Sequence, residues 1–122
     1  MTIGQSHILV IDDNEDILVM IETLLKFNGY KVTIRSNVEN IESFIKELSP
    51  DAILMDMLLS GADGREVCKQ LKSNTAFSHI PVIMISAHPL ARAECLKAGA
   101  NYFLEKPFEM QDLFEVIHDA VS

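Results

Sequence analysis

Long apolar runs, paired cysteines and an excess of basic residues are all missing from this 122-residue sequence. No apolar stretch approaches the roughly 20 residues that a transmembrane helix needs, and no charged segment followed by an apolar one gives a signal peptide. We therefore expect a cytoplasmic protein that does not bind a membrane.

Cysteine and histidine are too few and too scattered for a zinc site. The two cysteines, Cys68 and Cys95, fall in predicted helices without CxxC spacing, so we expect reduced thiols that serve packing. The four histidines show no metal-ligand spacing either.

Basic residues are scarce as well. The chain has 18 acidic and 10 basic residues, which give a net charge of -8. Because nucleic-acid binding requires a basic face, no direct binding to nucleic acid is expected. Some of the negative charge could attract a divalent cation; the alternative is an acidic surface that only aids solubility.

Five short apolar runs alternate with helical patterns. The predicted strands cover residues 8–11, 30–35, 52–56, 82–85 and 102–104, and the predicted helices cover 14–27, 38–48, 64–73, 91–98 and a segment after 107. This alternation predicts one α/β domain over residues 1–122, with a doubly wound, five-stranded parallel sheet covered by helices on both faces. The run 30–35 alternates in polarity, as an edge strand does, which favours the strand order 2-1-3-4-5.

The most apolar run, 52–56, ends on the carboxylate of Asp56. A strand buried on both faces should end on a charge only where its tip meets solvent, a metal or an opposite charge. The other candidate residues that follow strands are Asp12, Asp13, Ser86 and Lys106. Since the carboxyl ends of parallel strands lie together, three carboxylates, a hydroxyl and an ammonium are predicted to converge on one crevice.

Three clustered carboxylates raise one another's pKa unless Lys106 or a hard divalent cation compensates. Magnesium suits such a site because it takes one or two carboxylates and also binds phosphate oxygens. A carboxylate beside magnesium, a lysine and a hydroxyl is equipped to attack phosphorus. Taken singly, the Asp12-Asp13 pair could be a helix N-cap, and Ser86 and Lys106 a turn hydroxyl and a surface lysine. The coincidence of four strand ends favours the site.

This pattern resembles the receiver domain of bacterial response regulators, a flavodoxin-like fold, over essentially the whole chain. The residue pairs that also match the family are Asp63-Gly64, Ser86-Ala87, Gly99-Ala100 and Lys106-Pro107. The resemblance implies that Asp56 accepts phosphate from a sensor histidine kinase or a histidine phosphotransfer domain. It also implies that Ser86 and Lys106 contact the phosphoryl group.

The same resemblance implies a Mg²⁺ site and a switch. The implied metal site comprises Asp12, Asp13, Asp56 and Leu58. The implied switch pairs Ser86 with Phe103, an aromatic ring that rotates inward on activation. The Lys106-Pro107 bond is usually cis in the family, which these residue types permit.

The chain also departs from the family. Leu59-Ser60 stand where Met-Pro is frequent, and the stretch 86–99 is shorter than usual. That stretch belongs to the face that many receivers use for output, so the downstream partner cannot be inferred by analogy. No output domain is recognisable in the sequence.

Three functions other than that of a phosphoacceptor are open to such a fold. An aspartate-nucleophile phosphatase would want a carboxylate at position 58, which is Leu58. A flavodoxin-like cofactor binder would need a hydroxyl- and glycine-rich loop after the first strand, where Asp12-Asp13-Asn14 would repel phosphate. A phosphorylation-independent, receiver-like interaction scaffold remains the main alternative.

Overall fold

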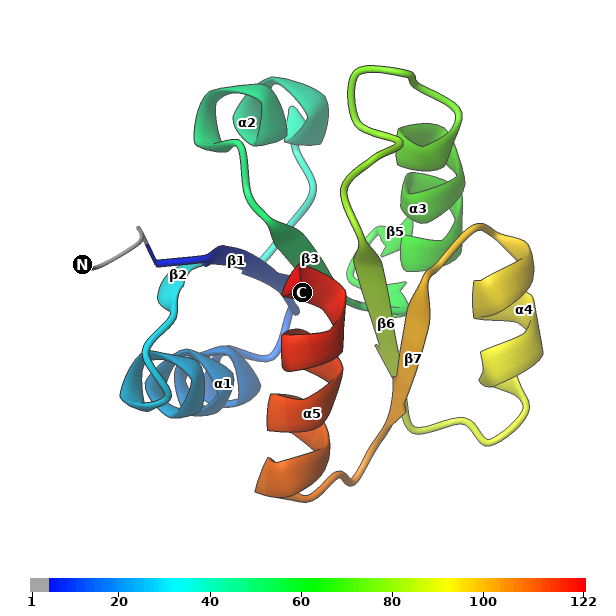
Figure 1. Cartoon of the computed structure of the whole chain (residues 1–122). Helices are drawn as coiled ribbons and strands as arrows, with labels where there is room; N and C mark the ends of the chain where they lie inside the picture. The colour runs from blue at the N-terminus through cyan, green and yellow to red at the C-terminus, as the bar shows by residue number, and fades with distance from the viewer. Residues whose placement is uncertain (1–4) are drawn as a thin grey trace.

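The computed structural model describes residues 5–122 and shows a five-stranded parallel sheet with helices on both faces (Figure 1). The sheet consists of β1 (His7–Ile11), β2 (Lys31–Arg35), β3 (Ala52–Asp56), β6 (Val82–Ser86) and β7 (Tyr102–Glu105). The helices are α1 (Glu15–Phe27), α2 (Ile41–Leu48), α3 (Gly64–Lys72), α4 (Ala91–Lys97) and α5 (Met110–Val121). The order β2-β1-β3-β6-β7 confirms the predicted order of the five strands.

The centre of the sheet is β3, which has β1 and β6 as its two neighbours. All five of its residues are buried, as expected for an apolar strand covered on both faces. The edge position of β2 confirms the expectation from its alternating polarity, since four of its five residues stay at least partly exposed.

Two apolar layers hold the helices against the sheet. One face of the sheet packs against α1 and α5, and the other face packs against α2, α3 and α4. Leu18, Ile21 and Leu25 show how this works for α1: they share one face at helical spacing and are all buried. No helix formed by residues 5–122 is both long and apolar enough to cross a membrane.

Asn14 and Gly29 define the two ends of α1. The Asn14 side chain accepts a hydrogen bond from the backbone N–H of Ile17 at 3.1 Å and caps the first turn. At the other end Gly29 adopts a φ of 93°, the left-handed conformation that commonly follows a helix.

Apart from strand and helix ends that shift by a single residue, two features differ from the prediction. The predicted loop 57–63 contains a small antiparallel hairpin, β4 (Leu58–Leu59) paired with β5 (Ala62–Asp63), because the chain reverses at Ser60 and Gly61. The predicted start of α2 near residue 38 was wrong, because Asn40 has a left-handed φ of 51° and the helix begins only after it.

The preceding turn is held by Arg35. Its guanidinium donates to the Glu39 carbonyl at 2.8 Å and lies 4.5 Å from the centre of the Phe44 ring. This arrangement fixes the segment between β2 and α2 without extending the helix into it.

Gly64 allows α3 to begin directly against the end of β3. A Cβ atom at Gly64 would lie 2.4 Å from the Asp56 carbonyl oxygen and 3.0 Å from that of Met57. The Gly64 N–H donates to the same Met57 carbonyl at 2.7 Å. The backbone of Asp56 therefore has no room for any side chain at position 64.

We expect Gly64→Ala to lower the free energy of unfolding by about 2–3 kcal/mol, since the backbone must shift to accept the methyl group. Gly29→Ala is the matched control: its Cβ would meet open space, so only the positive φ is penalised, at about 1 kcal/mol. Urea unfolding of both variants measures the difference. An equal or smaller loss for Gly64→Ala would contradict the steric argument.

Candidate functional site

The tips of β1, β3 and β7 bring three carboxylates and one ammonium together. The Lys106 Nζ lies 3.2 Å from Asp56 Oδ1 and 3.3 Å from Asp12 Oδ2. One oxygen from each of Asp12, Asp13 and Asp56 lies within 4.8 Å of the others. The structure therefore assembles these four predicted residues into one charged cluster.

Lys106 is held in this cluster by the end of the sheet. Its backbone N–H donates to the Ser86 carbonyl at 2.9 Å, which continues the pairing of β6 and β7 by one residue. Its peptide bond to Pro107 is cis, in agreement with the resemblance. The side chain is only 20% exposed, so the ammonium points inward to the carboxylates.

Asp12 is almost completely buried, with 1% of its side chain exposed. Its Oδ1 accepts the Asn14 N–H at 2.9 Å, and its Oδ2 faces Lys106. Because Asn14 is the residue that caps α1, the interpretation of Asp12 and Asp13 as the helix N-cap was wrong. A buried carboxylate that does not cap the helix needs its cation partner.

The pKa of the Asp56 carboxyl is raised above its ordinary value. Burial is the largest cause, and the negative charge of Asp12 adds to it. The Lys106 ammonium and its hydrogen bond oppose the shift, while Asp13 adds a smaller increase. Burial together with the two neighbouring carboxylates therefore outweighs the opposing effect of Lys106 on this pKa.

The three carboxylates form a donor set that fits Mg²⁺, which prefers carboxylate oxygens and keeps several waters. The Asp13 side chain is exposed, and its Oδ2 accepts a hydrogen bond from the Ser60 hydroxyl at 2.8 Å. Leu58, the fourth predicted member, is a 62% exposed residue and could offer a metal only its main-chain carbonyl.

Ser86 and Phe103, the predicted switch residues, have different surroundings. The Ser86 side chain is buried at the tip of β6, where its Oγ accepts the His88 N–H at 3.0 Å. Phe103 on β7 is half-buried against the apolar layer under α4, and the Arg92 guanidinium lies 6.0 Å from its ring centre. At that distance the cation–π contact lies at the outer limit of its range.

Two residues, Ser60 and Arg65, make polar contacts near the site that were not predicted. Ser60 reaches Asp13, as described above. Arg65 donates to Asp63 at 2.6 Å and to Glu94 at 2.9 Å, and so joins the start of α3 to α4. The Arg65 guanidinium also lowers the pKa of the Asp63 carboxyl, chiefly through its hydrogen bonds. The sequence carries no signal for either contact beyond the residue types.

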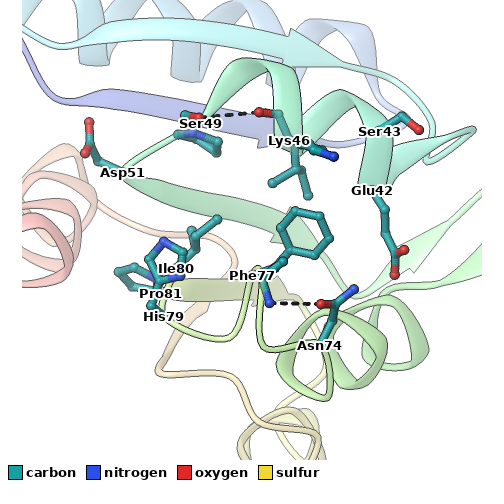
Figure 2. Close-up of a pocket in the computed structure, with 13 residues that line it drawn as sticks. Glu42, Ser43, Lys46, Ser49, Asp51, Asn74, Phe77, His79, Ile80 and Pro81 are labelled. Atoms are coloured by element: carbon teal, nitrogen blue, oxygen red, sulfur yellow. Dashed lines mark hydrogen bonds between the residues drawn. The ribbon is translucent and has the colours of Figure 1, made fainter.

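A groove of about 670 Å³ lies at the opposite end of the sheet (Figure 2). Figure 2 shows Lys46 from α2 on one side and Asn74 and Phe77, from the segment before β6, on the other. Asp51 lines the groove just before β3 begins. Asp56 ends the same strand about five residues later, and each residue of a strand adds about 3.3 Å. The groove is thus remote from the carboxylate cluster.

We expect Asp56→Asn to raise the free energy of unfolding at pH 7 in the absence of divalent cations. The raised pKa means that folded Asp56 holds its proton more tightly than the unfolded chain does. Wild-type stability therefore falls as pH rises from the ordinary carboxyl pKa through the raised one, and an uncharged amide avoids this loss.

Chemical unfolding across a pH series measures this effect. The advantage of Asp56→Asn should shrink in acid, where the carboxyl is protonated in both states. Asp119→Asn, at an exposed position on α5, is the control for the loss of one negative charge outside the cluster. If Asp56→Asn were less stable than wild type at pH 7, the charged Asp56 carboxylate would not be destabilising the fold.

Comparison with known proteins agrees with this geometry. The response regulator receiver domain family matches residues 8–118. The response regulator MprA of Mycolicibacterium vanbaalenii is 33% identical over 109 residues, which cover 88% of this chain and 46% of that protein. The chain thus spans less than half the length of the curated relatives it matches.

Solved structures show the same similarity. The receiver domain of sensor histidine kinase PA1611 from Pseudomonas aeruginosa PAO1, which has a magnesium ion coordinated in its active site cleft, is 29% identical, with a TM-score of 0.87 and coverage of 97% of this chain and 98% of that one. The receiver domain of NtrX from Brucella abortus is 28% identical, with a TM-score of 0.85 and coverage of 93% and 97%. The fold, the cluster of Asp12, Asp13, Asp56 and Lys106, and the family match over residues 8–118 lead to one conclusion: this chain belongs to the response regulator receiver domain family.

Proposed function

We propose that the chain is the phosphoacceptor of a two-component phosphorelay and that Asp56 is the residue phosphorylated. The observation that carries the proposal is the position of Asp56, a largely buried carboxylate at the tip of the central strand, 3.2 Å from the Lys106 ammonium and beside two further carboxylates. The proposed donor is the phosphohistidine of a sensor histidine kinase or a histidine phosphotransfer domain.

In the proposed step, a carboxylate oxygen of Asp56 attacks the phosphorus of phosphohistidine. The phosphorus–nitrogen bond breaks, its electron pair stays on the imidazole nitrogen, and that nitrogen takes up a proton. Lys106 is placed to neutralise charge on the transferred group, and the Ser86 hydroxyl to donate a hydrogen bond to it. Ser86 Oγ can do so because, among the residues 5–122 that the structure describes, it acts only as an acceptor, from His88, which leaves its own hydrogen free.

Asp12, Asp13 and Asp56 are the residues that would hold Mg²⁺, with the main-chain carbonyl of Leu58 as a further ligand. When bound, the ion supplies positive charge that offsets both the carboxylates and the phosphoryl oxygens. This use of the cluster explains why its carboxylates exceed what Lys106 alone can compensate.

A protein donor is supported by an apolar depression beside the site. It borders Lys106 and is lined by Ile17, Met20, Ala87, Pro107 and Phe108. Exposed apolar surface next to a charged crevice is typical of a protein contact rather than of a small-molecule pocket. A kinase or phosphotransfer domain that docks there would bring its histidine to Asp56.

The phosphatase alternative remains disfavoured, because position 58 carries an exposed leucine instead of an acid–base carboxylate. The interaction scaffold differs from the proposal only in chemistry: it would share the fold and the surface but would not accept phosphate. In this proposal the chain is a signalling domain. It takes part in its own phosphorylation and does not turn over a metabolic substrate.

The proposed consequence of phosphorylation is a change at Ser86 and Phe103. A phosphoryl group on Asp56 would draw the Ser86 hydroxyl away from His88 by a charge-assisted hydrogen bond. Phe103, which is half-buried against that layer and lies 6.0 Å from the Arg92 guanidinium, would then turn further into the layer.

Acetyl phosphate with Mg²⁺ should add one phosphoryl group to the wild-type protein, seen by intact mass, and hydroxylamine should remove it. Asp56→Asn should lose this gain. Asp51→Asn, which changes an exposed carboxylate at the opposite end of the same strand, should keep it. If Asp56→Asn gained as much mass as wild type does, another residue would be the phosphorylation site. If wild type gained no mass, the interaction scaffold would be favoured.

The switch is tested by structures solved with and without a beryllofluoride adduct on Asp56. We expect the Ser86 hydroxyl to move to the adduct and the exposed area of Phe103 to fall. Ser86→Ala is the control: it keeps the adduct but lacks the hydroxyl, so Phe103 should stay where it is. Identical positions of both side chains in the two wild-type structures would end the idea.

A further inference from the structure

Ser60 contacts the carboxylate cluster, although it does not lie at the end of one of the four strands that supply the cluster and Ser86. It lies at the turn between β4 and β5, and its hydroxyl donates to Asp13 Oδ2 at 2.8 Å across 47 residues of sequence. This distance is close to the optimum for an O–H···O bond. The family often has proline at this position, and proline has no side-chain donor.

Most oxygens of the cluster are engaged by protein donors. Both oxygens of Asp12 accept hydrogen bonds, one from Asn14 and one from Lys106. Lys106 also occupies Asp56 Oδ1, and Ser60 occupies Asp13 Oδ2. Within residues 5–122, Asp13 Oδ1 and Asp56 Oδ2 are the two cluster oxygens that accept no hydrogen bond.

We propose that Ser60 is a positioning residue for the metal site: it fixes the exposed Asp13 carboxylate by one oxygen and so presents the other oxygen to Mg²⁺. The inference rests on the proposed function, in which Asp13 is a metal ligand. Without this hydrogen bond, an exposed aspartate turns freely about its side-chain bonds, and the ion must restrict that freedom when it binds. A partner that orients the ligand beforehand removes part of this cost.

The hydrogen bond also draws some charge away from Asp13, which opposes metal binding. A carboxylate has about four lone-pair positions, however, so a single donor leaves the second oxygen fully available. Ordering therefore outweighs the loss of charge, and removal of the hydroxyl weakens metal binding.

Calorimetric titration of the purified chain with Mg²⁺ tests the proposal. Ser60→Ala should weaken affinity by about three- to tenfold, below the usual range for partners of metal ligands because Asp13 is exposed. Ser60→Thr keeps a hydroxyl and should bind as wild type does. Ser43→Ala, at an exposed serine on α2 that lines the remote groove of Figure 2, should leave the affinity unchanged.

Asp13→Asn separates the possible failures. If it weakens Mg²⁺ binding while Ser60→Ala binds as tightly as wild type or more tightly, the role of Ser60 is overturned and the metal site stands. If Asp13→Asn leaves affinity unchanged, or if wild type binds no Mg²⁺, the metal assignment fails and the role of Ser60 fails with it. Equal weakening in Ser60→Ala and Ser60→Thr would mean that the turn, and not the hydroxyl, matters. Urea unfolding without Mg²⁺ confirms that each variant is folded.

Discussion

The contact of Lys106 with two carboxylates is the interaction on which the carboxyl edge of the sheet depends. Parallel strands place Asp12 and Asp56 side by side, and nearly all of the Asp12 side chain is shielded from water. Two like charges in such a place are costly, by several kcal/mol per buried ion when no partner is present. The ammonium lies within 3.3 Å of both, so the sheet can end on charges. Three carboxylates face this one ammonium, so the cluster keeps its capacity to attract a cation.

Strands, their order and the convergence of their tips could be predicted because each depends on local sequence. An apolar run and the polar residue that ends it are adjacent in the chain. Parallel pairing then brings the carboxyl ends of the strands to one edge of the sheet. The start of α2 could not be predicted, since it depends on the left-handed backbone of Asn40. The contacts made by Ser60 and Arg65 could not be predicted either. Each contact joins side chains from different segments, across 47 residues for Ser60 and 29 for Arg65. It therefore depends on the orientation of a turn or of a helix end, which the local sequence does not specify.

The helices differ in how they are attached to the sheet. α1 buries three large aliphatic side chains, whereas the seven-residue α4 buries only Ala91 and Cys95. Small side chains bury little apolar area, so α4 gains less from the hydrophobic effect than its neighbours do. Its long side chains make up part of the difference: Glu94 binds Arg65, and Arg92 lies over Phe103. The helix beside the proposed switch is thus the one that depends most on polar, exchangeable contacts.

The distance in sequence between Asp12 and Lys106, 94 residues, has a consequence for the life of the protein in the cell. During synthesis the two carboxylates of β1 and β3 leave the ribosome long before the lysine that neutralises them. Until β7 joins the sheet, the carboxylates of the crevice repel one another and lack the Lys106 ammonium that compensates them. A chain without β7 therefore has the carboxylates but not the ammonium that compensates them. The charge cluster is complete only when the last strand has joined the sheet.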